Sequence, residues 1–230
     1  MPNEAVHTLT PSELAALFRV RVEVIKALYG ENNIFRLAGS KNALLDPGRP
    51  KVAILGTRDI RQNDLNIIDS VVSALSKRED KPVIISGLAV GTDTKAHVMA
   101  VRCGLPTYAV MPCGLDRMYP FHNTKLAETI EKNDGGLISY FPDGTEPIAL
   151  NFIERTKAIV LMSDVLIIPC CKRKGTAMLA ARYAYDINSP KVFAVPGEPG
   201  CVSHEGCNIL IKEGIAEIVC NINDFSTMKF

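Results

Sequence analysis

The chain of 230 residues has the length of one α/β domain with a small appendage, and its 47% hydrophobic content indicates a globular protein with a sizeable core. The formal net charge of +1 excludes nucleic-acid binding through a global positive field, so any such binding needs a local basic patch. There is no apolar run of about 18 residues and no basic-then-apolar leader, so we expect neither a transmembrane helix nor a signal peptide. Seven cysteines without paired spacing then predict reduced thiols and a cytoplasmic protein.

A helix is expected near the N-terminus. Thr10, Pro11 and Glu13 fit a capping box with proline at the first helical position. The apolar residues that follow at helical spacing are Leu14, Leu17, Phe18, Ile25 and Leu28. A polar stretch begins after Gly30, and DPGRP at 46–50 is typical of a linker turn. We therefore predict a short helical N-terminal extension over residues 1–48 and a main domain over residues 49–230.

From residue 51 onward, short apolar runs alternate with helical patterns. The predicted strands cover residues 51–55, 82–86, 107–111, 137–141, 165–169, 191–195 and 217–220. The predicted helices lie near residues 64–75, 93–103, 123–130, 152–162, 176–187 and 206–213. Several strands are continuously apolar, as burial on both faces of a sheet requires. The sequence thus predicts an α/β fold with a doubly wound, mostly parallel, Rossmann-like sheet and right-handed crossovers.

The loops that follow the predicted strands are rich in glycine and basic residues. They include GTR at 56–58, SGLAVGTD at 86–93 and CCKRKGTA at 170–177. Glycines allow close approach of a ligand to the backbone, and helix N-termini offer unpaired N–H groups and a positive dipole end. The basic residues expected at this edge of the sheet are Arg58, Arg117, Lys172, Arg173 and Lys174. The pattern predicts an anionic ligand, either a phosphate, a nucleotide or a nucleic-acid strand, but no GKS or GKT supports ATP hydrolysis.

Several stretches together resemble the DNA-processing protein A family (DprA, also called Smf). In chain order they are VAILGTR (52–58), SGLAVGTDTKAH (86–97), AVMPCGLDRMYP (109–120), GGLISYFP (135–142), KGTAMLAARYA (174–184), VFAVPG (192–197) and SHEGCNILIKEGI (203–215). The resemblance implies an extended Rossmann-like domain that forms dimers, binds single-stranded DNA and helps to load a RecA-type recombinase during natural transformation. It also implies no established enzymatic activity. We expect neither a cofactor nor a metal site. Many members continue into a winged helix, which we do not expect in this chain.

The family's motifs suggest which residues contact the nucleic acid. By position, Arg58 corresponds to a loop arginine near the phosphates, and Phe152 falls on the family's FPxRNR stretch. The residues implied to bind nucleic acid or phosphate are Thr57, Arg58, Ser86, Gly87, Gly91, Thr92, Phe152, Arg155, Lys157, Lys174, Gly175 and Thr176. The departures from the family pattern are Val90 in place of arginine, Tyr140 in place of glutamate, RTK at 155–157 in place of RNR, and Lys174 in place of serine.

A single strand on such a surface would lay its phosphates along the positive sheet edge. We expect Arg58, Arg155 and Lys157 to contact phosphates, and Phe152 or Tyr119 to stack on a base. Without the family resemblance, Arg155 and Lys157 would be interpreted as part of a solvated helix face.

Two other functions fit the same sheet edge. PCCKRKGTAMLA at 169–180 resembles the PGGxGTxxE signature of LOG-type phosphoribohydrolases. However, Met178, Leu179 and Ala180 occupy the positions around the signature glutamate, so the hydrolytic acid or base is missing. A small-nucleotide sensor would use the glycine loops without chemistry, and mononucleotides would then raise its melting temperature whereas oligo-dT would not.

Cys201, His204 and Cys207 are metal-ligand types within seven positions, but no fourth ligand is nearby in sequence. A loop that leads into a helix capped by Ser203 is therefore favoured over a zinc site. His97 is expected to be a structural histidine that hydrogen-bonds a neighbouring loop. The adjacent cysteines at 170–171 are expected to be packing thiols rather than a redox pair.

Overall fold

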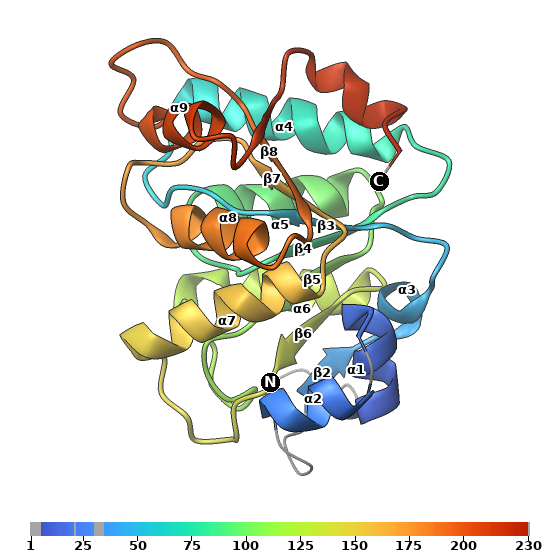
Figure 1. Ribbon diagram of the computed structural model, residues 1–230. Coiled ribbons are helices and arrows are strands. Elements are labelled where there is room, and N and C mark those ends of the chain that lie inside the picture. The colour runs from blue at the N-terminus through green and yellow to red at the C-terminus, as the bar shows by residue number, and fades with distance from the viewer. Residues whose placement is uncertain (1–5, 21, 30–34, 230) are drawn as a thin grey trace.

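The strands of the computed structural model, which describes residues 6–20, 22–29 and 35–229, form one sheet (Figure 1). Within these residues there are nine strands, in the order β1-β2-β6-β5-β4-β3-β7-β8-β9. They are β1 (Val6–Leu9), β2 (Phe35–Gly39), β3 (Lys51–Ile54), β4 (Val83–Ser86), β5 (Thr107–Val110), β6 (Gly136–Ser139), β7 (Val165–Ile168), β8 (Lys191–Ala194) and β9 (Glu217–Ile218). The β1–β2 and β2–β6 pairs are antiparallel and all other neighbouring pairs are parallel. The predicted mostly parallel α/β sheet is confirmed.

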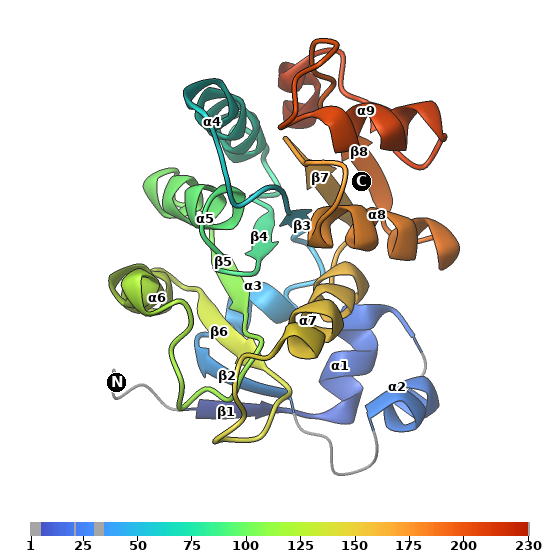
Figure 2. The same ribbon diagram turned by 90° about the vertical axis from the view of Figure 1, so that its left-hand side faces the viewer.

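Helices cover both faces of this sheet. They are α1 (Pro11–Phe18), α2 (Val22–Tyr29), α3 (Asn42–Leu45), α4 (Gln62–Ser76), α5 (Thr92–Arg102), α6 (Thr124–Lys132), α7 (Ala149–Leu161), α8 (Thr176–Asp186) and α9 (Glu205–Lys212), with short 3-10 helices η1 (Phe121–Asn123) and η2 (Ile222–Ser226). Figure 2 shows α4, α5 and α6 on one side of the sheet and α1, α7, α8 and α9 on the other. The central strands are therefore buried on both faces, which explains their continuously apolar sequences. Among the described residues, none of the helices combines the length and the apolar composition that a membrane span requires.

The N-terminal segment, expected to be only helical, adds two strands to the sheet. β2 pairs with β6, so that Leu37 lies opposite Ile138, and β1 pairs with the outer edge of β2. Phe35 and Leu37 alternate with the half-buried Arg36 and Ala38, which is the period of a strand covered on one face. The helical expectation for residues 1–48 is therefore wrong for these strands, whereas the division at residue 48 stays a prediction.

The first helix is also shorter than its pattern predicts. Its capping box is present, because the backbone N–H of Thr10 donates to Glu13 Oε2 at 2.8 Å and the N–H of Glu13 donates to Thr10 Oγ1 at 3.2 Å. The helix stops at Arg19, which adopts a left-handed conformation with φ 53°, and α2 follows as a separate element. The expected apolar face is buried at Leu14, Leu17, Phe18 and Ile25. The side chain of Leu28 and the polar stretch after Gly30 lie outside the described residues.

Candidate nucleic-acid interface

The loops after β3 and β7 meet where the strand order of the sheet reverses. The chain passes from β3 through β4 and β5 to β6 on one side, and then returns to β7 on the other side of β3. Open α/β sheets bind their ligands at such a reversal, beyond the carboxyl ends of the strands. A pocket of about 320 Å³ lies at this point. It brings together five predicted site residues, namely Thr57, Arg58, Lys174, Gly175 and Thr176.

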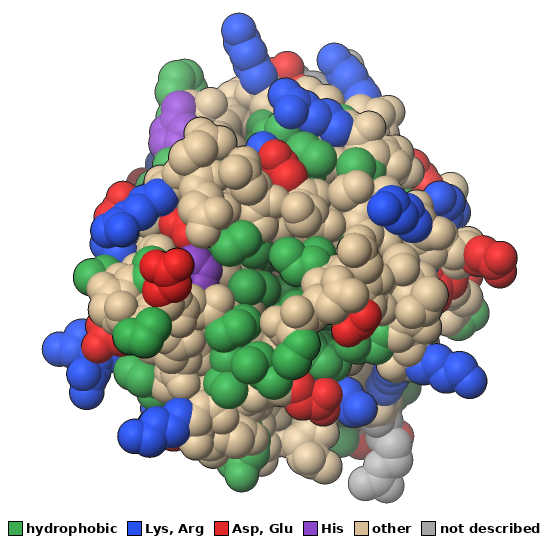
Figure 3. Space-filling model, turned by 90° about the horizontal axis from the view of Figure 1, so that it is seen from above, with side chains coloured by type: hydrophobic (Ala, Val, Ile, Leu, Met, Phe, Trp, Pro, Cys, Tyr) green, Lys and Arg blue, Asp and Glu red, His purple; other side chains and the backbone are tan. Residues whose placement is uncertain are grey.

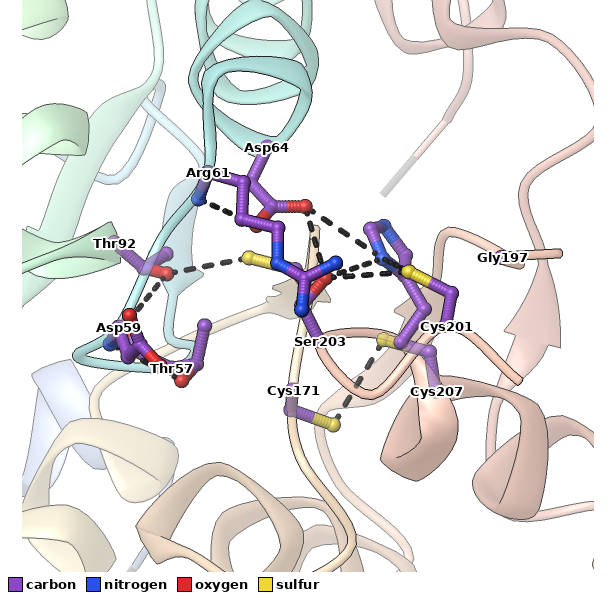
Figure 4. A network of polar contacts seen from close by, with 12 residues as sticks. Thr57, Asp59, Arg61, Asp64, Thr92, Cys171, Gly197, Cys201, Ser203 and Cys207 are labelled. Carbon is purple, nitrogen blue, oxygen red and sulfur yellow. Dashed lines mark hydrogen bonds and ion pairs between the residues drawn. The ribbon is translucent and has the colours of Figure 1, made fainter. Parts of the chain in front are cut away.

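Backbone hydrogen bonds fix the path of the loop after β3. The N–H of Thr57 donates to the Cys170 carbonyl at 3.1 Å, and Thr92 donates to the Thr57 carbonyl through its N–H at 3.1 Å and its hydroxyl at 3.0 Å (Figure 4). Gly91 has φ +85°, and a Cβ there would lie 2.5 Å from the carbonyl oxygens of Thr57 and Arg58. Gly91 and Thr92 therefore hold the Arg58 loop in place from the side of α5.

The glycine loop after β4 encloses a carboxylate of the protein itself. Asp93, in the first turn of α5, is 5% exposed. Burial raises its pKa, while Arg155 and the backbone N–H groups of Ala89 and Gly87 oppose that rise. These backbone donors thus serve Asp93 rather than an external anion, and the open helix N-terminus at this edge belongs to α8. Asp93 was not among the predicted site residues, although an acidic residue directly behind a glycine loop is a signal that could have found it.

Arg155 of α7 is buried against the same loop. It is 3% exposed, and its Nη1 lies 3.6 Å from Asp93 Oδ2. A Cβ on Gly87 would lie 1.0 Å from that Nη1, so only glycine leaves room for the guanidinium. Burial lowers the pKa of Arg155, and its Nε and Nη1 have no hydrogen-bond partner within the described parts of the chain. Arg155 is therefore a desolvated cation beneath the surface and not part of a solvated helix face.

Arg58 is the exposed cation above this buried pair. Its guanidinium carbon lies 5.3 Å from the centre of the Phe152 ring, and the ring is 6.0 Å from the guanidinium carbon of Arg155. The half-buried Tyr119 meets Phe152 edge to face, with 5.3 Å between ring centres. A cation and two aromatic rings thus lie side by side next to the pocket, which is the combination that binds phosphate and base together.

The other basic residues expected at this edge differ in their partners. Three of them form ion pairs with acidic neighbours, at 2.7 Å for Lys172–Asp59, 3.4 Å for Arg173–Glu205 and 2.8 Å for Arg117–Glu146. Over the residues that the structure describes, Arg58 and Lys174 have no acidic partner. Because exposed ion pairs contribute little stability, the paired lysine and arginines can exchange their carboxylates for phosphates at small cost.

Ser86 and Lys157 do not join the pocket. Ser86 is fully buried, and its hydroxyl donates to the Ile54 carbonyl at 2.7 Å, which links β4 to β3. Lys157 is paired with Glu154 at 2.7 Å and follows Arg155 by two positions, so it points roughly 200° away around α7. The structure thus separates Lys157 from Arg58 and Arg155, with which we expected it to act.

A second polar network, shown in Figure 4, ties the loop after β8 to the start of α4. The hydroxyl of Ser203 donates to Asp64 Oδ1 at 3.3 Å, and Asp64 Oδ2 accepts the N–H of Arg61 at 2.8 Å. The residue at the N-cap of α9 is His204, not Ser203 as expected, because the Ser203 hydroxyl is engaged by Asp64. Within the described residues, no group of three His, Cys, Asp or Glu side chains converges as a metal site would require.

His97 has the structural role expected of it. It is fully buried in α5, and its Nδ1 lies 2.7 Å from the hydroxyl of Thr107 at the start of β5. That hydroxyl donates to the Ile84 carbonyl, so the histidine must carry its proton on Nδ1. Burial, with a smaller effect of Arg155, lowers the pKa of His97 to about 3.

The fold and the pocket agree with the comparison to known protein families. The model of the family "DNA recombination-mediator protein A" matches residues 24–229. The chain belongs to this family, the DprA family.

Individual relatives support the assignment. The DNA processing protein DprA of Streptococcus pneumoniae is 33% identical over 76% of this chain and 60% of its own length. Protein Smf of Synechocystis is 34% identical over 76% of this chain, but only 42% of its own length. The chain thus spans about half the length of these relatives. Its fold matches the solved structure of DNA processing protein A from Helicobacter pylori with a TM-score of 0.80 and 27% identity, over 97% of this chain and 95% of that one.

Membership in the DprA family does not favour the phosphoribohydrolase alternative. The α8 segment that resembles the LOG-type signature carries Met178, Leu179 and Ala180 on the first turns of the helix, where hydrolysis would need a carboxylate. Of the departures from the DprA pattern, Val90 leaves an exposed apolar side chain instead of a charge, and Tyr140 stacks on Phe141 with 4.3 Å between ring centres. Because Lys172 is paired with Asp59, the unpaired positive charge among the described residues that line the pocket rests on Arg58 and Lys174.

Proposed function

We propose that this protein binds single-stranded DNA at the pocket between the β3 and β7 loops. The observation that carries the proposal is Arg58, an exposed arginine without an acidic partner in the described chain, which lies 5.3 Å above the Phe152 ring. The single-stranded DNA binding mode for which the Helicobacter pylori relative was studied supports the same ligand class.

In this proposal a phosphate lies between Arg58 and Lys174, at the N-terminus of α8. Gly175 and Thr176, at the start of α8, line the pocket there, and the unpaired N–H groups of a helix N-terminus are neutral donors for a phosphate next to the two cations. Neutralisation of phosphates by these cations releases counterions, so binding weakens as salt rises. A base then stacks on Phe152 or Tyr119, which is tolerant of sequence because every base has a flat face.

Arg155 supports this surface from below. The buried guanidinium lies 6.0 Å from the centre of the Phe152 ring, and like-charge repulsion with Arg58 favours an anion close to the two arginines. We therefore assign Arg155 a positioning role instead of the direct phosphate contact expected from the motif. Lys157, which is paired with Glu154, has no part in this proposal.

The wider role of the family is also a proposal for this chain. We propose that the protein acts in the cytoplasm, without catalysis, and assists a RecA-type recombinase, because the family is described as a recombination mediator. We also propose a homodimer through the end of the molecule that carries α4 and α9. Figure 3 looks down on that end and shows hydrophobic side chains at the centre with Lys and Arg around the margin. Val202 and Ile218, in the loop before α9 and in β9, are each 50% exposed.

A titration with three ligands tests the proposed function. Fluorescence anisotropy with labelled oligo-dT, the same length of duplex DNA, and AMP as competitor would be measured at two salt concentrations. We expect oligo-dT to bind most tightly, with weaker binding at the higher salt. If oligo-dT binds no better than the duplex, or if AMP displaces it fully at an equal concentration of nucleotide, the protein is not a single-strand-binding protein and the proposal is wrong.

A further inference from the structure

Three sulfur atoms lie together behind the pocket, where β7 ends. The Sγ of Cys171 is 3.8 Å from the Sγ of Cys207 and 3.9 Å from the Sδ of Met178. All three side chains are buried, with 2%, 0% and 6% of their surface exposed. Figure 4 shows the sulfurs of Cys171 and Cys207 directed at each other from the β7 loop and from α9. The proposed DNA contacts make no use of this cluster.

The spacing of these sulfurs suits a bound metal ion. A metal that holds each sulfur at about 2.3 Å keeps neighbouring sulfurs about 4 Å apart in a trigonal arrangement. The two separations from the Cys171 sulfur, 3.8 and 3.9 Å, have this value.

The kind of ligand selects the kind of metal. Two thiolates and a thioether are soft donors, which favour Cu(I) over harder cations. A structural zinc site needs four nitrogen, sulfur or carboxylate ligands, and no third His, Cys, Asp or Glu joins Cys171 and Cys207 among the described residues. Cys170, although adjacent in sequence, lies elsewhere, since its Sγ contacts the Thr92 hydroxyl at 3.5 Å.

The cluster adjoins the pocket between the β3 and β7 loops. Cys171, although 2% exposed, is one of the residues that line this pocket, and the proposed path of an ion to the cluster leads past Lys172 and Lys174. The contact with Cys171, together with burial, raises the pKa of Cys207, and this thiol stays protonated until a metal displaces the proton.

We propose that Cys171, Cys207 and Met178 form a binding site for Cu(I). Binding forms two thiolate–copper bonds and one thioether–copper bond, releases two thiol protons to solvent and transfers no electrons. The bound ion joins the β7 loop to the starts of α8 and α9. Loading therefore raises the melting temperature, because the metal binds the folded chain better than the unfolded one.

Competition for Cu(I) under anaerobic conditions tests the site. The fully reduced protein, with all seven thiols titrated beforehand, would be mixed with Cu(I) held by the coloured chelator bicinchoninate. We expect the wild type to withdraw one equivalent. Cys171→Ser and Cys207→Ser should each weaken Cu(I) binding by more than about tenfold, because even substitutions outside the metal's ligands weaken binding about tenfold. Met178→Leu should weaken binding less. Cys170→Ser and the exposed Cys220→Ser are matched controls that should bind as the wild type does.

A second measurement does not depend on the folding of any variant. X-ray absorption of the wild-type protein loaded with one Cu(I) should show three sulfur neighbours at about 2.3 Å. The proposal is overturned if reduced protein withdraws no Cu(I), if the absorption spectrum shows nitrogen or oxygen neighbours, or if Cys220→Ser abolishes the binding that Cys207→Ser leaves intact.

Discussion

Gly87 is the position where one added methyl group perturbs the site most. A Cβ there would lie 1.0 Å from Nη1 and 2.2 Å from Cζ of Arg155, so Gly87→Ala must displace the guanidinium. Asp93, which lies 3.6 Å from that guanidinium and is 5% exposed, then loses its cation. Loss of one partner of a buried ion pair costs about 3–5 kcal/mol. We expect Gly87→Ala to lower the free energy of unfolding by about 3 kcal/mol, the lower end of that range, because burial already raises the pKa of Asp93 and protonation relieves part of the loss.

Urea unfolding followed by circular dichroism measures this loss. The variants are Gly87→Ala, Arg155→Met and the double variant, with Gly48→Ala in an exposed turn as the control, for which a change within about 0.5 kcal/mol is expected. In the Arg155→Met background the added methyl group has no guanidinium to displace, so Gly87→Ala should then cost much less. Equal costs in the two backgrounds, or no cost in the wild type, would refute the packing of Arg155 against Gly87.

The remaining predictions concern binding and pH. Arg58→Ala should weaken oligo-dT binding and reduce the slope of log K against log salt by about 0.7. Lys157→Ala removes only the ion pair with Glu154 and should change neither the affinity nor the slope. Similar anisotropy curves for the two variants would contradict the proposed site. Phe152→Ala should cost about 1–3 kcal/mol of binding free energy and leave the salt dependence of binding nearly unchanged. A salt dependence reduced as much as that of Arg58→Ala would argue against stacking. Because burial holds the pKa of His97 at about 3 while the unfolded chain titrates at 6.5, stability should fall as pH drops below 6.5. The loss should reach about 2 kcal/mol at pH 5. In denaturant titrations, the free energy of unfolding of His97→Leu should depend less on pH than that of the wild type. An equal pH dependence in the two proteins would mean that other groups cause it.

The central sheet could be predicted because its strands carry a strong local signal. Strands buried on both faces are short apolar runs, and those at 83–86 and 165–168 lie within two residues of their predicted bounds. β2 was missed because Phe35 and Leu37 alternate with Arg36 and Ala38, a weak pattern over five residues. The break after α1 was missed because Arg19 takes a left-handed conformation without the glycine that usually marks one.

The site was predictable only where topology alone decides it. Loops after parallel strands must share one edge, so Arg58 and Lys174 could be expected together from the strand order. Whether Arg155 is exposed depends instead on the missing side chain of Gly87, which lies far away in sequence. The separation of Lys157 from Arg155 follows from their two-residue spacing on α7, a helical relation that the motif resemblance obscured.

Photo-crosslinking is the most direct test of where the DNA lies. A single-stranded oligonucleotide that contains 5-iodo-deoxyuridine would be irradiated with the protein, and the crosslinked peptides identified by mass spectrometry. We predict crosslinks to Phe152 or Tyr119, the rings beside Arg58. Efficient crosslinks confined to peptides outside this edge of the sheet would contradict the proposed interface.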